Sequence, residues 1–217
     1  MKIKQLGVDR FTLKFLAIAA MLLDHIGWGF YPGSLWMRCV GRLTMPLMCY
    51  FVGEGFRQTH DIKRYAGRLL IFALVAEIPF QLYFYEPGNV MFTLLGGLLL
   101  LWAWRDLRNR FAACGVMVLI LAAVSLPGYE TDYGATGVMM VFLAGYLSHP
   151  VARAIAPALL CGLNNAMAGA SVPLWYWPLF AGILLCFYHG KRGYSMKYLF
   201  YVFYPLHLLI LWRIRMW

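Results

Sequence analysis

The chain has 217 residues, of which 62% are hydrophobic and only 13% are charged, and its mean hydropathy is +0.66. This composition excludes the ordinary soluble globular class. The net charge of +10 would favour a nucleic-acid partner in a soluble protein, but here the basic residues lie between apolar runs, so no nucleic-acid partner is expected. The sequence predicts a single all-α domain over residues 1–217, a polytopic integral membrane helical bundle.

The first apolar run, residues 13–31, carries an acid and a histidine side by side, Asp24 and His25. As a helix, the run places His25 about 18 Å beyond Leu13, too deep for its side chain to reach water. Ionisable groups at that depth cost about 2.5–3.5 kcal/mol or more each, so they need partners. The run is too long for a signal peptide and lacks a cleavage site, so we expect a retained span. The pair predicts either a polar packing cluster or a reaction centre.

Nine apolar runs are candidate spans, with an expected N-in, C-out topology: residues 13–31, 36–55, 65–84, 90–104, 111–127, 134–147, 151–169, 173–188 and 198–214. The sixth is short and the seventh contains Asn164 and Asn165, so either could be a broken helix packed inside the bundle. The segment between the second and third spans, residues 54–65, is expected to form a short interfacial helix.

The orientation follows from the positive-inside rule. Fifteen of the 19 Lys and Arg fall in segments that are cytoplasmic if the N-terminus is inside: Lys2, Lys4, Arg10, Lys14, Arg57, Lys63, Arg64, Arg68, Arg105, Arg108, Arg110, Arg153, Lys191, Arg192 and Lys197. The opposite loops are acidic, with Glu86, Glu130 and Asp132.

Further polar residues lie deep in other spans. Arg38 and Arg42 are one helical turn apart, and Pro46 cannot donate to the Arg42 carbonyl, so a bend is expected there. Glu77 and His207 fall at a similar depth in the third and ninth spans. We expect Asp24, His25, Arg42, Glu77 and His207 to share a polar chamber, with Asp24 paired to Arg42.

The basic residues Arg57, Lys63, Arg64 and Arg68 lie at the cytoplasmic end and are either ordinary topological charge or an anion site for the phosphates of an acyl donor. The five cysteines are scattered without ligand spacing, so neither a metal site nor a disulfide framework is expected.

Several segments resemble the TraX family of bacterial inner-membrane proteins: LKFLAIAAMLLDHIG, GRLTMPL with EGFRQTHDIKRYAGRLLIFALVAEIPF, NVMFTLLGG, DYGATGV and KYLFYVFYPLHLLIL. The resemblance covers most of the chain, and the long second block is its specific part.

Founding members of that family act in plasmid conjugation and acetylate the N-terminus of pilin. The family also resembles wider transmembrane acyltransferases, including the heparan-α-glucosaminide N-acetyltransferase type, in which a first-span Asp-His lies at the reaction centre. That resemblance implies a catalytic role for Asp24 and His25. The segment TMPLMCYF has methionines where such members often carry aromatics, which leaves the shape of the pocket open.

The expected function is therefore transfer of an acyl group from cytoplasmic acetyl-CoA to an acceptor at the membrane or periplasmic face, such as a pilin N-terminus or an envelope glycan or lipid. In this hypothesis His25 is the general base or the nucleophile. Arg38, Arg42, Glu77 and His207 position the substrate, and either Arg42 or His207 stabilises the oxyanion. A proton-coupled transporter and a non-catalytic envelope assembly factor are the alternatives, since both can use polar residues within the membrane.

Overall fold

The computed structural model describes residues 7–191, 193–194 and 199–217, and these residues form ten α-helices. The β-type pairing within them is a single isolated bridge between Val8 and Tyr188, so the predicted all-α fold is confirmed. The helices are α1 (Arg10–Phe30), α2 (Leu35–Gly41), α3 (Thr44–Gln58), α4 (Ile62–Phe84), α5 (Val90–Asp106), α6 (Arg110–Ala123), α7 (Gly134–Tyr146), α8 (Pro150–Met167), α9 (Val172–Cys186) and α10 (Leu199–Arg215).

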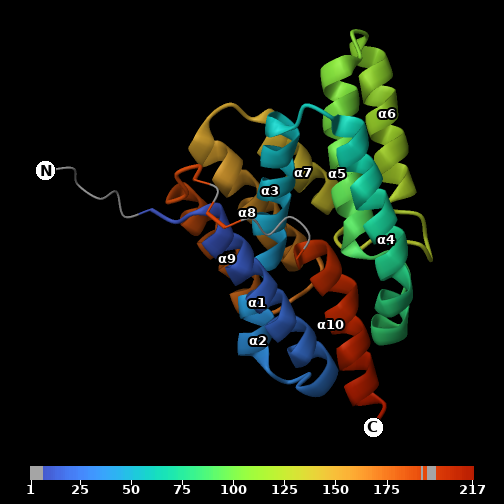
Figure 1. The fold of residues 1–217 in the computed structure, drawn as a ribbon, viewed down its shortest axis with the longest axis vertical. Helices are drawn as coiled ribbons and strands as arrows, with labels where there is room; N and C mark the ends of the chain where they lie inside the picture. Colours follow the sequence, from blue (N-terminus) through green and yellow to red (C-terminus); the bar gives the residue numbers. More distant parts are fainter. Residues whose placement is uncertain (1–6, 192, 195–198) are drawn as a thin grey trace, which may run out of the picture.

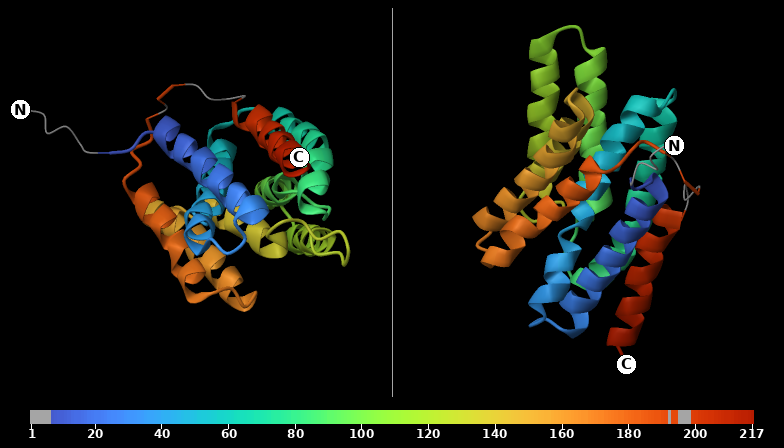
Figure 2. Two further views of the ribbon diagram at one scale, coloured as in Figure 1. Left: turned by 90° about the horizontal axis from the view of Figure 1, so that it is seen from below. Right: turned by 90° about the vertical axis from the view of Figure 1, so that its left-hand side faces the viewer.

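The helices form one bundle with two chemically distinct ends (Figure 1). We call the end with the α3–α4 and α5–α6 connections the basic end; it carries Arg57, Lys63, Arg64, Arg105, Arg108 and Arg110. The acidic end contains the α4–α5 and α6–α7 loops, with Glu86, Glu130 and Asp132. These two loops are joined by a hydrogen bond from the Asp132 amide to the Gly88 carbonyl, at 2.7 Å. Figure 2 shows α10 lying between α1 and α4, with the C-terminus at the far end of the bundle from the start of α1.

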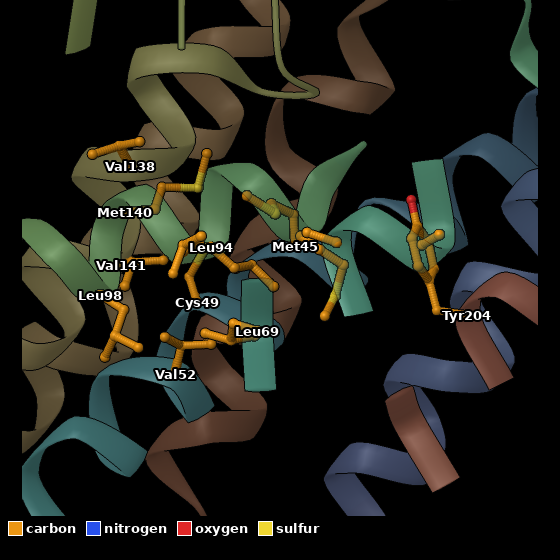
Figure 3. Packing of buried hydrophobic residues seen from close by; sticks show 14 of the residues in the cluster. Met45, Cys49, Val52, Leu69, Leu94, Leu98, Val138, Met140, Val141 and Tyr204 are labelled. Atoms are coloured by element: carbon orange, nitrogen blue, oxygen red, sulfur yellow. The ribbon is translucent and has the colours of Figure 1, made fainter. Parts of the chain in front are cut away.

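Helix α7 lies at the centre of the core. Its side chains Val138, Met140 and Val141 are fully buried and pack among those of α3 and α5, including Cys49 and Leu98 (Figure 3). The 13 residues of α7 measure about 20 Å, which is shorter than a bilayer core of about 30 Å. Helix α7 is therefore short and buried, as expected, but it is continuous rather than broken.

The second predicted span is broken into α2 and α3. Residues Arg42 and Leu43 form a turn between them, and Pro46 follows at the start of α3. Since Pro46 has no N–H for the Arg42 carbonyl, the predicted bend is confirmed and takes the form of a complete break. Helices α4 and α10, by contrast, remain continuous through Pro79 and Pro205.

The predicted interfacial helix over residues 54–65 is wrong. Helix α3 continues to Gln58, residues 59–61 form a tight connection, and α4 begins at Ile62. The Asp61 side chain accepts a hydrogen bond from the Arg64 amide at 2.9 Å, so it caps α4 and starts the new helix immediately.

The outer surface of the bundle is apolar along several helices. Helices α1 and α4 are both long enough and apolar enough to cross a membrane. On α4 the exposed side chains include Ile71 (59% exposed), Leu74 and Ile78, and α6 and α10 likewise expose Leu119 and Ile210. Of the basic residues used to predict the orientation, Lys2, Lys4, Arg192 and Lys197 lie outside the described residues.

Candidate functional site

The centre of the candidate site is a pair of histidines from α1 and α10. The Nδ1 atom of His25 lies 2.7 Å from the Nε2 atom of His207, and the two ring planes differ by only 8°. The ring centroids are 4.9 Å apart, much farther than the two nitrogens, so the rings meet at their edges in a hydrogen bond. The predicted convergence of these two histidines is confirmed.

The surrounding hydrogen bonds assign the protons of this pair. The Nδ1 atom of His207 lies 2.8 Å from the Phe203 carbonyl oxygen, which can only accept, so this nitrogen carries a proton. In a neutral His207 ring, Nε2 is then an acceptor, and His25 must donate to it from Nδ1. The lone pair of a neutral His25 is consequently on Nε2, which has no hydrogen-bond partner among the described residues. This is the protonation state that a general base or a nucleophile requires.

The backbone of α1 at His25 is fixed from α4. The Tyr83 hydroxyl, on a fully buried side chain, donates to the His25 carbonyl at 2.6 Å. The Phe84 ring meets the His25 ring edge-on, with centroids 5.2 Å apart, and Phe203 stacks on His207 at 4.7 Å. Aromatic side chains from two helices therefore hold both imidazoles in place.

Asp24 faces α2, away from the histidine pair, because successive side chains of a helix diverge by about 100°. Its Oδ1 atom lies 2.9 Å from Nη1 of Arg38, in an ion pair whose side chains are 18% and 25% exposed. The prediction that Asp24 pairs with Arg42 is therefore wrong: Arg42 lines the same cavity, but its guanidinium donates to Tyr133 instead. A Cβ atom at Gly41 would collide with the Asp24 side chain, so the glycine permits this close approach of α2 to α1.

Arg42 instead points towards the α6–α7 loop. Its Nη1 atom donates to the Tyr133 hydroxyl at 3.0 Å, while its buried Nε atom has no partner among the described residues. Arg42 and His25 line the same cavity, so the Arg42 guanidinium is the candidate donor to an oxyanion that develops there. The alternative oxyanion donor, His207, has both ring nitrogens engaged by His25 and Phe203, which leaves no free donor on that ring.

Glu77 does not join the chamber, contrary to expectation. Its carboxylate accepts hydrogen bonds from the Gly88 amide at 2.8 Å and from the Asn89 side chain at 2.6 Å, and also from Gln81. These bonds hold the α4–α5 loop against α4. The distance along α4 placed Glu77 at the right depth, but the rotation of the helix turns its side chain to the loop.

Three cavities lie in a row through the bundle. The acidic-end cavity, of about 330 Å³, is lined by Asp24, His25, Trp28, Arg38, Arg42, Phe80, Phe84, Glu86, Pro87, Gly88, Glu130, Asp132 and Tyr133. The middle cavity, of about 50 Å³, shares Asp24, His25, Asp132 and Tyr133 with it and adds Met21, Thr44 and Met45. The basic-end cavity, of about 240 Å³, shares Met48 and Phe200 with the middle one. His25 therefore lies where the middle and acidic-end cavities adjoin.

Of the four basic residues predicted to bind an anionic donor, the basic-end cavity includes only Arg68. Arg57 donates to the carbonyls of Gly145 and Leu147, Arg64 pairs with Asp61, and Lys63 is exposed.

Two other cations line the basic-end cavity, Arg10 and Lys14. They had been assigned to topological charge alone. The signal in the sequence was that Lys14 lies inside the apolar run of the first span.

Asp132, in the loop before α7, adds an acid to the same chamber. Its side chain is exposed, and it lines the acidic-end cavity. Desolvation by the surrounding protein raises the pKa of Asp132 to about 6, and the nearby Arg42 guanidinium opposes the rise.

Comparison with known proteins identifies the family. A family model described as "TraX protein" matches residues 9–215. The chain is 34% identical to the probable fimbrial assembly protein FimC, serogroup H1, of Dichelobacter nodosus, over 98% of both chains. It is 27% and 25% identical to two proteins named Protein TraX, from Escherichia coli and its strain K12, covering 94% of this chain and 86% of each relative. No solved structure matches the chain significantly. The chain belongs to the TraX family.

Proposed function

We propose that this protein is an integral-membrane acyltransferase that moves an acyl group, in the simplest case acetyl from acetyl-CoA, to an acceptor on the other side of the bundle. The observation that carries the proposal is the histidine pair, whose hydrogen bonds leave an unprotonated Nε2 on His25 where two cavities adjoin.

In this proposal the bundle crosses the bacterial inner membrane nine times, with α2 and α3 together forming one crossing. The basic end faces the cytoplasm by the positive-inside rule, and the exposed apolar side chains of α4, α6 and α10 contact lipid. The nine alternating crossings place the N-terminus inside and the C-terminus outside, in agreement with the opposite positions of the start of α1 and the end of α10.

The chemistry requires one proton acceptor and one oxyanion donor. The amine or hydroxyl of the acceptor gives its proton to Nε2 of His25 and forms a bond to the thioester carbonyl carbon. Arg42 stabilises the negative charge that develops on the carbonyl oxygen. When the intermediate collapses, the C–S bond breaks and the thiolate takes up the proton from His25. In a two-step route, Nε2 attacks the thioester carbonyl carbon and the C–S bond breaks, which releases the thiolate. The acceptor then takes the acyl group from the imidazole, and its proton passes to the thiolate.

The relatives indicate where the acceptor is to be sought. One is named for fimbrial assembly and others carry the TraX name, so a pilus subunit N-terminus or another envelope component is the proposed acceptor.

The row of cavities also fits a second candidate, a carrier that moves a small solute through the bundle. A non-catalytic assembly factor would need neither the hydrogen-bonded histidine pair nor the cavities.

The test is an acyl-transfer assay on purified protein with radiolabelled acetyl-CoA and envelope fractions from the source organism. His25→Gln should lower transfer by about 10²–10⁴-fold while the protein remains folded. His60→Gln is the matched control, since His60 is an exposed histidine at the basic end and should transfer normally. Equal activity in both variants would remove His25 from the mechanism and favour the carrier.

A further inference from the structure

The basic-end cavity contains more positive than negative charge. Its lining includes three cations, Arg10, Lys14 and Arg68, and no acidic residue. The neighbouring Glu54 compensates only one of them, through a 3.0 Å ion pair with Nη2 of Arg10. The Tyr188 hydroxyl also bonds to both of these side chains, so Arg10 and Glu54 form a closed structural cluster.

Lys14 and Arg68 remain uncompensated. The Lys14 ammonium lies over the Phe51 ring, 5.6 Å from its centroid, and no carboxylate of the described residues lies within ion-pair distance. The buried Nε atom of Arg68 has no hydrogen-bond partner among the residues that the structure describes. The Arg68 guanidinium lies 5.6 Å from the Tyr65 ring centroid. Two cations withdrawn from water without a counter-charge create a favourable place for an anion.

Most of the remaining lining of this cavity is apolar, and part of it is shared with the middle cavity that contains His25. Met48 and Phe200 line both the basic-end and the middle cavity, and Val52, Leu69 and Leu94 extend the apolar lining. A ligand that fills both cavities therefore needs an anionic group at one end and a long, thin, uncharged arm at the other.

The required length of that arm follows from α1. Lys14 and His25 are eleven residues apart on one continuous helix, which corresponds to about 16 Å. A phosphopantetheine arm has as many backbone bonds between phosphorus and sulfur as four to five residues of extended chain, or about 15 Å. With its phosphate near Lys14, the thioester carbonyl reaches the level of His25.

We infer that the basic-end cavity binds the 4′-phosphopantetheine portion of an acyl thioester, with its phosphate between Lys14 and Arg68 and its thioester beside His25. The inference rests on the proposed function for the fate of the acyl group, but the binding is a separate property. The same arm is carried by coenzyme A and by acyl carrier protein, and the cavity recognises the part that they share.

The test is a direct binding measurement on purified protein in detergent, without any acceptor. Coenzyme A, free 4′-phosphopantetheine, pantetheine without phosphate, and holo-acyl carrier protein are the probes. Lys14→Gln and Arg68→Gln should each weaken binding of 4′-phosphopantetheine by about tenfold or more, since each removes a charge-assisted hydrogen bond. The same variants should leave the weaker binding of pantetheine unchanged.

Lys63→Gln and Arg64→Gln serve as matched controls, because they remove cations from the same end of the bundle outside the cavity. They should bind all four probes normally. Lys14→Arg and Arg68→Lys retain the charge and should restore most of the affinity, which separates loss of the ligand contact from loss of the fold. Stronger binding of coenzyme A or of holo-acyl carrier protein identifies which carrier supplies the arm.

The inference and the proposed function fail in different ways. Normal phosphopantetheine binding by Lys14→Gln and Arg68→Gln would overturn the inference even if acyl transfer were demonstrated. Charge-dependent binding without any acyl transfer would support the inference and contradict the proposed function.

Discussion

At the scale of single residues, the site depends on which nitrogen of each imidazole carries a proton. The Phe203 carbonyl determines this for His207, and His207 in turn determines it for His25. His207 is then a positioning residue, which acts on the reaction only through the tautomer and orientation of His25.

This role predicts different effects for two substitutions of His207. His207→Gln keeps an oxygen acceptor for the His25 Nδ1 proton and should retain a substantial part of the activity. His207→Leu removes the acceptor, frees His25 to adopt the wrong tautomer and should lower kcat by about 10²-fold. Initial rates of acyl transfer, measured together with the KM for the donor, would check this. Equally large losses of kcat in both variants would contradict the role of His207 in setting the tautomer of His25.

The ion pair between Asp24 and Arg38 gives a second prediction at this scale. Asp24→Asn or Arg38→Gln alone leaves one charge unpaired, at a cost of about 3–5 kcal/mol for a fully buried pair and less for this partly exposed one. The double variant should therefore lose less stability than the sum of the single losses. Thermal unfolding in detergent measures the coupling, and Asp24→Asn combined with Arg42→Gln is the comparison that should show the weaker coupling, since Arg42 lines the same cavity without an ion pair to Asp24. Strong coupling to Arg42 and none to Arg38 would contradict the observed pairing.

At the scale of the elements, much of the fold could be predicted from the sequence. Each of the nine apolar runs contains a helix of the structure, because sustained hydrophobicity and the loops between the runs are local properties. The break at Arg42 was also local, since it follows from the missing N–H of Pro46.

The rotation of each helix about its axis could not be predicted in this way. The distance of each residue from the start of its apolar run gives its depth, and by depth Glu77 and Arg42 were expected near Asp24. Which side chains meet, however, is determined by packing between helices. For this reason Arg38 replaces Arg42 as the partner of Asp24, and Glu77 holds a loop. The donor cations were misassigned for the same reason, because only a cavity distinguishes Lys14 from Lys63.

The contact between α1 and α2 yields a prediction at the element scale. Gly41→Ala adds a methyl group against the Asp24 side chain, which should destabilise the protein by about 1–3 kcal/mol and disturb the ion pair with Arg38. Gly67→Ala, in the interior of α4 with open space around its Cβ position, should instead stabilise the protein by about 0.5–1 kcal/mol. Unfolding temperatures of the two variants compare these effects directly. A harmless Gly41→Ala would mean that α2 does not approach α1 this closely.

At the scale of the whole molecule, the three adjoining cavities run from the basic end of the bundle to its acidic end. Lys14 and Arg68 line the cavity at the basic end, His25 lines the middle one, and Arg38, Glu86 and Glu130 line the one at the acidic end. The account therefore requires that donor and acceptor reach His25 from opposite sides of the membrane, since an anionic thioester cannot cross it.

The most direct test is to measure from which side of the membrane the protein uses acetyl-CoA. Sealed inverted and right-side-out membrane vesicles containing the protein would be supplied externally with labelled acetyl-CoA, and transfer of the label to membrane components would be followed. Inverted vesicles should transfer the label, and right-side-out vesicles should do so only after permeabilisation, with His25→Gln inactive in both. Equal transfer by intact vesicles of both orientations, or transfer confined to the right-side-out ones, would contradict the account.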